Sequence, residues 1–179
     1  MKKENFFTFW LTGLSGAGKT TTSKAFKEEM SRVGMSACII DGDELRSGLC
    51  SDLGFSAADR SENVRRAACM AKILNSNGVH AIVAMISPYS VDREAAYEII
   101  GESRCIEVYL NTPLHVCEKR DPKGLYAKAR TNSAAQMTGI QSPYECPEKP
   151  ALVIDTSSAD VSHSVNMLMN LFVNKFNHE

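Results

Sequence analysis

The feature that most constrains this chain is a glycine-rich string near its N-terminus, Gly13-Leu14-Ser15-Gly16-Ala17-Gly18-Lys19-Thr20, which matches the phosphate-binding pattern GxxxxGK(S/T). An apolar run at 6–11 precedes the string and predicts a strand. Residues 21–33 follow it with apolar side chains at helical spacing and predict a helix that ends before Gly34. Because a glycine-rich loop at a helix N-terminus points backbone N–H groups at an anion, the sequence predicts a nucleotide-phosphate site here.

Two side chains of this string have chemical roles of their own. Lys19 is predicted to reach the β- and γ-phosphates as a catalytic residue, and Thr20 is predicted to ligate the accompanying Mg²⁺. The predicted ATP-binding residues at this loop are Gly13, Leu14, Ser15, Gly16, Ala17, Gly18, Lys19, Thr20 and Thr21.

Composition limits the class of protein. A length of 179 residues fits a single domain spanning 1–179, and 44% hydrophobic with 23% charged residues is ordinary for a soluble globular chain. The formal charge of −1 gives no general reason to bind nucleic acid or an anionic membrane. No apolar run approaches the about twenty residues of a membrane span, and no targeting segment precedes the first strand. We therefore expect a cytoplasmic protein without nucleic-acid or membrane partners.

The six cysteines predict neither a metal site nor a disulfide framework. None forms a CxxC pair, and the four histidines are not spaced with them as zinc ligands. We expect reduced thiols in a reducing compartment.

Strand-like and helix-like stretches alternate along the whole chain. The further predicted strands are 35–40, 79–86, 104–110 and 151–154, and the further predicted helices are 61–77, 92–100, 113–120 and 161–176. Such alternation predicts an α/β three-layer sandwich, in which helices flank a central parallel five-stranded sheet, of the P-loop NTPase kinase type.

The alternation breaks down at about 121–150. This stretch contains four prolines and two glycines and has no sustained periodicity, so we predict an irregular connection. Long irregular connections in compact domains often cover an active site. Basic residues at its start favour a lid over phosphates, and 121–150 is called the lid below.

Charged and polar residues follow the predicted strands, where ligands gather in parallel sheets. Asp41 and Asp43 come after the second strand, and a carboxylate there can hold Mg²⁺ or take a proton from an attacking hydroxyl. Asp41 alternatively fits a turn or helix N-cap. Arg46 and Arg60 favour an anionic second substrate. Ser87 follows the third strand, either beside the site or only as a helix-start turn residue.

In order along the chain, several strings resemble the adenylyl-sulfate kinase (APS kinase) family. The resemblance covers about Trp10 to Asp155, and its strings are the glycine-rich loop, Asp41-Gly42-Asp43, Asp52-Leu53-Gly54-Phe55-Ser56, Asp59-Arg60, Glu62-Asn63-Val64-Arg65-Arg66, Ile86-Ser87-Pro88, Asp121-Pro122-Lys123-Gly124-Leu125-Tyr126, Thr138-Gly139-Ile140 and Ser142-Pro143-Tyr144-Glu145. It implies transfer of the γ-phosphoryl group of ATP to the 3′-hydroxyl of adenylyl sulfate, giving 3′-phosphoadenylyl sulfate and ADP in sulfate activation. It also implies a homodimer.

The resemblance also implies roles for individual residues. Phe55 would stack on the substrate adenine, and the arginines would meet the phosphosulfate. Ser87 matches a serine described as a phosphoryl-accepting intermediate and is predicted as a catalytic residue. A structural or substrate-orienting role is the alternative, because in-line transfer requires no covalent intermediate. Asp43 is expected to orient or deprotonate the 3′-hydroxyl, and Arg120 to pack near the ATP adenine. The residues implied around adenylyl sulfate are Asp43, Arg46, Phe55, Arg60, Asn63, Ile86, Ser87 and Lys123.

Met137 is a departure from the family pattern, which commonly has phenylalanine before the Thr138-Gly139-Ile140 triplet. We predict that Met137 packs on the substrate adenine with less directional contact than an aromatic ring. Two alternatives stay open from the residues alone: a kinase of the same fold that acts on a nucleotide or a sugar acid, and a catalytically idle nucleotide-binding module.

Overall fold

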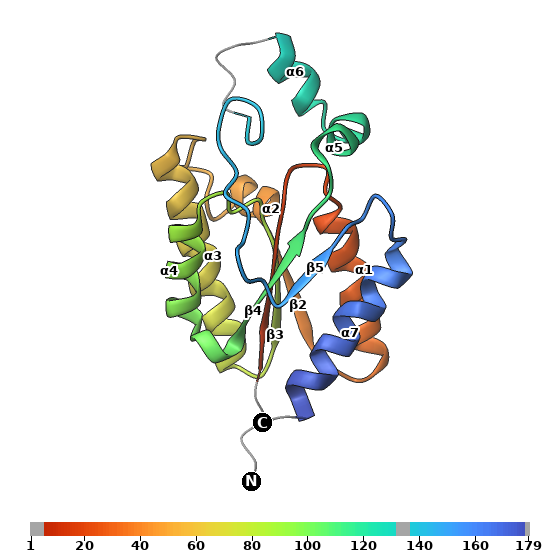
Figure 1. The fold of residues 1–179 in the computed structure, drawn as a ribbon. Coiled ribbons are helices and arrows are strands. Elements are labelled where there is room, and N and C mark those ends of the chain that lie inside the picture. The colour runs from red at the N-terminus through yellow and green to blue at the C-terminus, as the bar shows by residue number, and fades with distance from the viewer. Residues whose placement is uncertain (1–5, 132–136, 178–179) are drawn as a thin grey trace.

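The sheet at the centre of the molecule is all parallel, with the strand order β2-β3-β1-β4-β5 (Figure 1). The computed structural model describes residues 6–131 and 137–177. The strands are β1 Thr8–Thr12, β2 Ala37–Asp41, β3 His80–Ala84, β4 Cys105–Leu110 and β5 Leu152–Ile154. All five strands lie within the predicted stretches except for Thr12 and Asp41, which extend two of them by one residue. Their carboxyl ends meet at one edge of the sheet, where the site lies.

Two pairs of helices cover the sheet, one pair on each face (Figure 1). The first pair is α1 Lys19–Arg32 with α7 Val161–Asn177, and the second is α3 Ala57–Ser76 with α4 Ser90–Ile100. Each face of β1 contributes to a separate core because strand side chains alternate between faces. Phe9 packs edge-on against Phe26 of α1 at 4.9 Å between ring centroids, while Trp10 is buried in the core beneath α3 and α4. The predicted three-layer sandwich is confirmed.

Four short elements complete the fold. They are α2 Gly42–Ser47, the 3₁₀ helix η1 Glu102–Arg104, α5 Leu114–Arg120 and α6 Leu125–Thr131. The helices α5 and α6 lie beyond the carboxyl ends of the strands (Figure 1). Of the predicted lid, residues 132–136 lie outside the described residues.

The prediction that 121–150 is irregular was wrong at α6. The Asp121 carboxylate accepts the backbone N–H groups of Tyr126 and Ala127, and thereby satisfies donors of the first turn. Tyr126 is buried and donates its hydroxyl to Ser15 O, so contacts with the glycine-rich loop stabilise this short helix. Seven residues are too few for a helical period to be visible in the sequence.

Polar side chains cap two helices at positions outside the predicted helix ranges. Ser56 and Asp59 form a reciprocal capping box, so α3 begins at Ala57, before the predicted start. Asp41 caps α2, a helix that was not predicted. The six cysteines form no disulfide, and no helix among the described residues has the length and apolar character needed to cross a membrane.

Candidate active site

A cleft of about 1170 Å³ opens at the carboxyl ends of the strands. The glycine-rich loop, the ends of β2 and β3, the start of α3 and the lid all contribute to its wall. The predicted site residues that line it are Ser15, Gly16, Gly18, Lys19, Thr20, Thr21, Asp43, Arg46, Phe55, Arg60, Asn63, Ile86, Ser87, Arg120, Lys123 and Met137. The remaining three, Gly13, Leu14 and Ala17, belong to the same loop but do not line the cleft. The structure therefore brings together residues from most of the chain length.

The glycine-rich loop lies directly against the second half of the chain. A β-carbon at Gly13 would be 2.7 Å from Leu110 O, and one at Gly16 would be 2.8 Å from Cys117 O. Gly16 also has φ 78, which a side chain disfavours. These two glycines are required by close backbone packing as well as by phosphate approach.

The Lys19 ammonium is held on the glycine-rich loop itself. Its Nζ donates to Gly13 O and Leu14 O, both at 2.8 Å. Burial lowers the pKa of Lys19 from 10.5 to about 8, because the surrounding protein solvates an ammonium less well than water does. A phosphate that enters the loop would replace these neutral acceptors with an anion.

Thr20 and Asp41 form the oxygen-rich corner of the cleft. The Thr20 hydroxyl donates to Asp41 Oδ2 at 2.8 Å, and the other Asp41 oxygen accepts the N–H of Asp43 at 2.9 Å. The structure confirms the interpretation of Asp41 as a helix N-cap, since it caps α2, and it also places Asp41 beside Thr20, the predicted metal ligand. Asp41 was not among the predicted site residues, although its position after the second predicted strand had indicated a place near the site.

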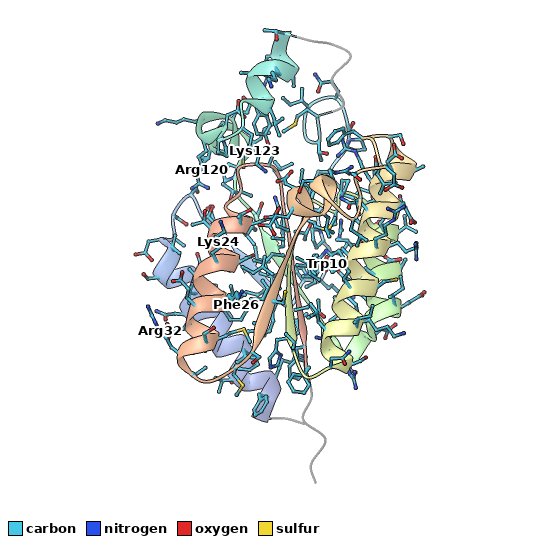
Figure 2. All side chains as sticks on the ribbon, turned by 180° about the vertical axis from the view of Figure 1, so that it is seen from behind. Trp10, Lys24, Phe26, Arg32, Arg120 and Lys123 are labelled. Carbon is cyan, nitrogen blue, oxygen red and sulfur yellow. The ribbon has the colours of Figure 1, made fainter. Side chains whose placement is uncertain are left out.

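A second residue of the cleft that was not predicted from the sequence is Thr156, which follows β5. Its hydroxyl donates to Ala17 O at 3.0 Å and accepts from Arg120 at 2.8 Å. Arg120 also donates to Gly16 O at 3.2 Å and to Thr156 O at 2.6 Å. Figure 2 shows Arg120 and Lys123 above the carboxyl ends of the strands. Arg120 and Thr156 thus brace the back of the glycine-rich loop.

The acceptor side of the cleft is built around the Phe55 ring, which is 62% exposed. The Arg46 guanidinium carbon lies 4.6 Å from the ring centroid and that of Arg60 lies 6.0 Å from it. Arg60 is buried and donates to Phe55 O at 2.9 Å and to Thr138 Oγ1 at 2.7 Å. Arg60 therefore connects the start of α3 to the lid beside Met137.

Asn63 of α3 presents a buried polar group to the cleft. The side chain is 3% exposed, and its Oδ1 has no hydrogen-bond partner among the described residues. Buried carbonyl oxygens are rarely left unpaired in folded proteins. A ligand that donates a hydrogen bond at this point would satisfy it.

An ion pair joins the two sides of the cleft mouth. Lys123 of the lid pairs with the Asp43 carboxylate in the first turn of α2, and both side chains are partly open to solvent. The two residues are 80 positions apart in the sequence and were predicted separately.

Ser87 is buried at the wall of the cleft, and its hydroxyl already has partners. Its Oγ accepts the indole N–H of Trp10 at 2.9 Å and lies 3.3 Å from Met85 O, to which it donates. This arrangement fits the orienting role better than that of an attacking hydroxyl.

Comparisons with known proteins include a family model that covers most of this chain. Residues 5–155 match the family model described as adenylylsulphate kinase. The adenylyl-sulfate kinase of Shewanella amazonensis is 47% identical over 164 residues, which are 92% of this chain and 83% of that protein.

Two solved structures extend this agreement to three dimensions. The Mycobacterium tuberculosis APS kinase in complex with AMPPNP and APS superposes with a TM-score of 0.91 at 40% identity. The match covers 95% of this chain and 99% of the Mycobacterium tuberculosis chain. A hexameric APS kinase from Thiobacillus denitrificans gives a TM-score of 0.72 at 30% identity and covers 97% of this chain and 30% of that one.

Proposed function

The chain belongs to the adenylylsulphate kinase family, and from that premise we propose which residues of its cleft carry out the reaction. The protein is an ATP-dependent kinase that phosphorylates adenylyl sulfate to 3′-phosphoadenylyl sulfate. The residue roles below rest on the geometry of the cleft and on the resemblance to the family.

The donor half is the glycine-rich loop with its brace. Backbone N–H groups of Gly16 to Lys19 surround the β- and γ-phosphates of ATP, and the Lys19 ammonium leaves Gly13 O and Leu14 O to contact them. Arg120, which lines the cleft beside Thr156, lies on the side where the ATP adenine is expected.

Mg²⁺ is the proposed metal, held by the Thr20 hydroxyl with Asp41 beside it. No cluster of three or more His, Cys, Asp or Glu side chains that could hold a metal occurs within 6–131 and 137–177. A hydroxyl and one carboxylate suit Mg²⁺, which usually completes its ligands with substrate phosphates and water. When bound, it would supply positive charge against the phosphate oxygens.

The acceptor half is the Phe55 platform with its arginines. Phe55 would stack on the adenine of adenylyl sulfate from one side and Met137 would pack from the other. Arg46 and Arg60 would then meet the phosphosulfate, and Asn63 Oδ1 would accept a hydrogen bond from the bound nucleoside.

The transfer itself is a direct in-line attack of the 3′-hydroxyl on the γ-phosphorus. Asp43 orients this hydroxyl and accepts its proton as the new P–O bond forms and the bond to the ADP oxygen breaks. Lys123 leaves its ion pair with Asp43 and contacts the transferred phosphoryl group, where it stabilises the negative charge that develops. Ser87 fixes the wall of the acceptor half and takes no phosphoryl group.

One observation carries this assignment: Lys19 of the donor loop and the Asp43–Lys123 pair line the same cleft. The test is a coupled assay of ADP release with ATP and Mg²⁺, comparing adenylyl sulfate with AMP, GMP and gluconate. We expect turnover with adenylyl sulfate and loss of turnover by at least about a thousandfold in a folded Lys19→Ala variant. Preference for AMP, GMP or gluconate would support a different small-molecule kinase, and nucleotide binding without transfer would support an idle module.

Further expectations from the sequence remain proposals. We propose that the chain forms one domain, that it assembles as a homodimer and that it works in the cytoplasm. Sedimentation equilibrium of the purified protein would decide between a dimer and another assembly.

A further inference from the structure

The turn Ile86-Ser87-Pro88, which follows β3 and lines the acceptor half, has an unfavourable backbone conformation. Ser87 has φ 40, and Asp121 is the other non-glycine residue with positive φ in the described part of the chain. A residue with a β-carbon avoids this region unless its surroundings hold it there. The structure must therefore contain groups that fix Ser87.

Arg93 of α4 is one of those groups. Its side chain is 3% exposed, and its Nη1 donates to Ser87 O at 2.8 Å. Its Nε donates to Glu107 Oε1 of β4 at 2.9 Å, so the guanidinium is fixed from the opposite side. Arg93 does not line the cleft and would act only through Ser87.

Trp10 fixes the same serine through its side chain. The indole N–H donates to Ser87 Oγ at 2.9 Å. Trp10 and Glu107 are register partners on β1 and β4, so both side chains leave the same face of the sheet. Trp10 reaches Ser87 directly, and Glu107 reaches it through Arg93. Figure 2 shows Trp10 near the centre of the molecule, at the sheet.

The buried pair of Arg93 and Glu107 is a weak source of stability. The cost of removing two charges from water offsets most of their attraction, and apolar residues of similar size often replace such pairs without loss of stability. The specific consequence of the pair here is a fixed donor at Ser87 O.

We propose that Arg93, fixed by Glu107, is a positioning residue for the acceptor substrate. It holds Ser87 in its left-handed conformation and thereby shapes the wall against which adenylyl sulfate binds. This inference rests on the proposed acceptor half of the site. It assigns no role to Arg93 at the ATP side.

The main test is the double variant Arg93→Met/Glu107→Leu, which removes both charges and so leaves neither buried alone. We expect the KM for adenylyl sulfate to rise by about tenfold or more while the KM for ATP stays within about twofold. The thermal midpoint should stay within a few degrees of that of the wild type. The matched control is Arg32→Met/Glu29→Leu, which removes an exposed pair on α1 and should leave both KM values unchanged.

A spectroscopic readout follows from composition. Trp10 is the single tryptophan of the chain and bonds to Ser87, so its emission reports on the turn without turnover. We expect adenylyl sulfate to change this emission in the wild type and to change it much less in the double variant. The variant Arg93→Lys keeps a positive charge beside Glu107 but lacks the fork that holds two acceptors, and it should show the same kinetic split.

Several outcomes would overturn the inference. One is an unchanged KM for adenylyl sulfate in both Arg93 variants. Another is an equal rise in the KM for adenylyl sulfate and the KM for ATP together with a lower thermal midpoint. A double variant that does not fold would contradict the premise that the pair adds little stability. The wild type is measured first, and its failure to phosphorylate adenylyl sulfate would count against the proposed function. The change in Trp10 emission on binding tests the role of Arg93 separately, because it requires no turnover.

Discussion

Lys123 reaches across the mouth of the cleft from the lid and pairs with the Asp43 carboxylate at the start of α2. Neither group is deeply buried, so the pair itself adds little to stability. Its significance is positional, because the proposed base and the proposed charge-stabilising lysine are already in contact before substrate enters. In the proposed mechanism, binding of adenylyl sulfate replaces this contact with contacts between these residues and the substrate.

Lys123→Ala and Asp43→Asn should each lower kcat with adenylyl sulfate by about a hundredfold or more, because one removes stabilising charge and the other the proton acceptor. The double variant should lose much less than the product of the two effects, since the residues act together. Steady-state kinetics of the three variants provide the measurement. Lys24→Ala, an exposed lysine on α1 seen in Figure 2, is the control and should keep wild-type kcat. Strictly multiplicative losses would argue that the two residues act independently.

ATP binding should depend on pH through Lys19. Burial lowers the pKa of Lys19 to about 8, so the ammonium is charged below that pH and neutral above it. The anionic phosphates prefer the charged form, and affinity should fall by up to about tenfold per pH unit above pH 8 as binding has to take up a proton. Calorimetry of a non-hydrolysable ATP analogue, between pH 7 and 9.5 in buffers of different ionisation enthalpy, measures this uptake. Lys19→Met should bind weakly and with no proton uptake; equal uptake in that variant would assign the proton elsewhere.

The buried imidazole of His80 should make the fold less stable in acid. Its Nδ1 accepts the N–H of Phe7 at 3.1 Å, and burial lowers the pKa of His80 from 6.5 to about 4. The unfolded chain therefore binds the extra proton between about pH 6.5 and 4. The stability that neutral His80 contributes is complete above pH 6.5 and falls by up to about 3 kcal/mol as the pH drops to 4.

Urea unfolding at a series of pH values tests this expectation. His80→Gln should flatten the pH dependence between 6.5 and 4, whereas His115→Gln, at an exposed histidine, should keep the wild-type slope. Parallel curves for wild type and His80→Gln would exclude His80 as the cause.

Loss of the brace behind the glycine-rich loop should weaken the donor site alone. Thr156→Val removes the hydroxyl that donates to Ala17 O and accepts from Arg120 Nη1, while the bond from Arg120 to the backbone Thr156 O remains. We expect the KM for ATP to rise by about tenfold with little change for adenylyl sulfate. Ser162→Ala, on the exposed side of α7, is the matched hydroxyl deletion and should behave as wild type. An unchanged KM for ATP in Thr156→Val would mean that Arg120 holds the loop without the hydroxyl.

Met137→Phe should improve binding of the acceptor. An aromatic ring opposite Phe55 would complete a stacked pair around the adenine, worth about threefold to tenfold in affinity. The KM for adenylyl sulfate should fall accordingly, and the KM for ATP serves as the internal control. A rise in the KM for adenylyl sulfate would show that the space beside Thr138 does not admit the larger ring.

The sequence predicts the sheet well because the two strands that are buried on both faces, β1 and β3, are mostly apolar and contain only Thr8, Thr12 and His80 as polar residues. It does not predict α2 and α6, whose starts depend on the carboxylates of Asp41 and Asp121 rather than on a periodic face. Asp43, Arg46, Arg60 and Ser87 of the acceptor half were predicted from their places after strands, and its other residues from motif strings. Thr156 and Arg93 were not, because their partners Ala17 and Ser87 come close only when the strands are in order.

The brace of the glycine-rich loop also has a consequence for biosynthesis. Gly13 and Gly16 pack on the backbones of Leu110 and Cys117. Ala17 O accepts a hydrogen bond from Thr156, which lies 139 positions later in the sequence. The most recognisable motif of the chain therefore leaves the ribosome 139 residues before Thr156 and gains its working shape only after β5 has followed. A nascent or truncated chain that ends before β5 would carry the complete motif in its sequence and still lack a competent ATP site.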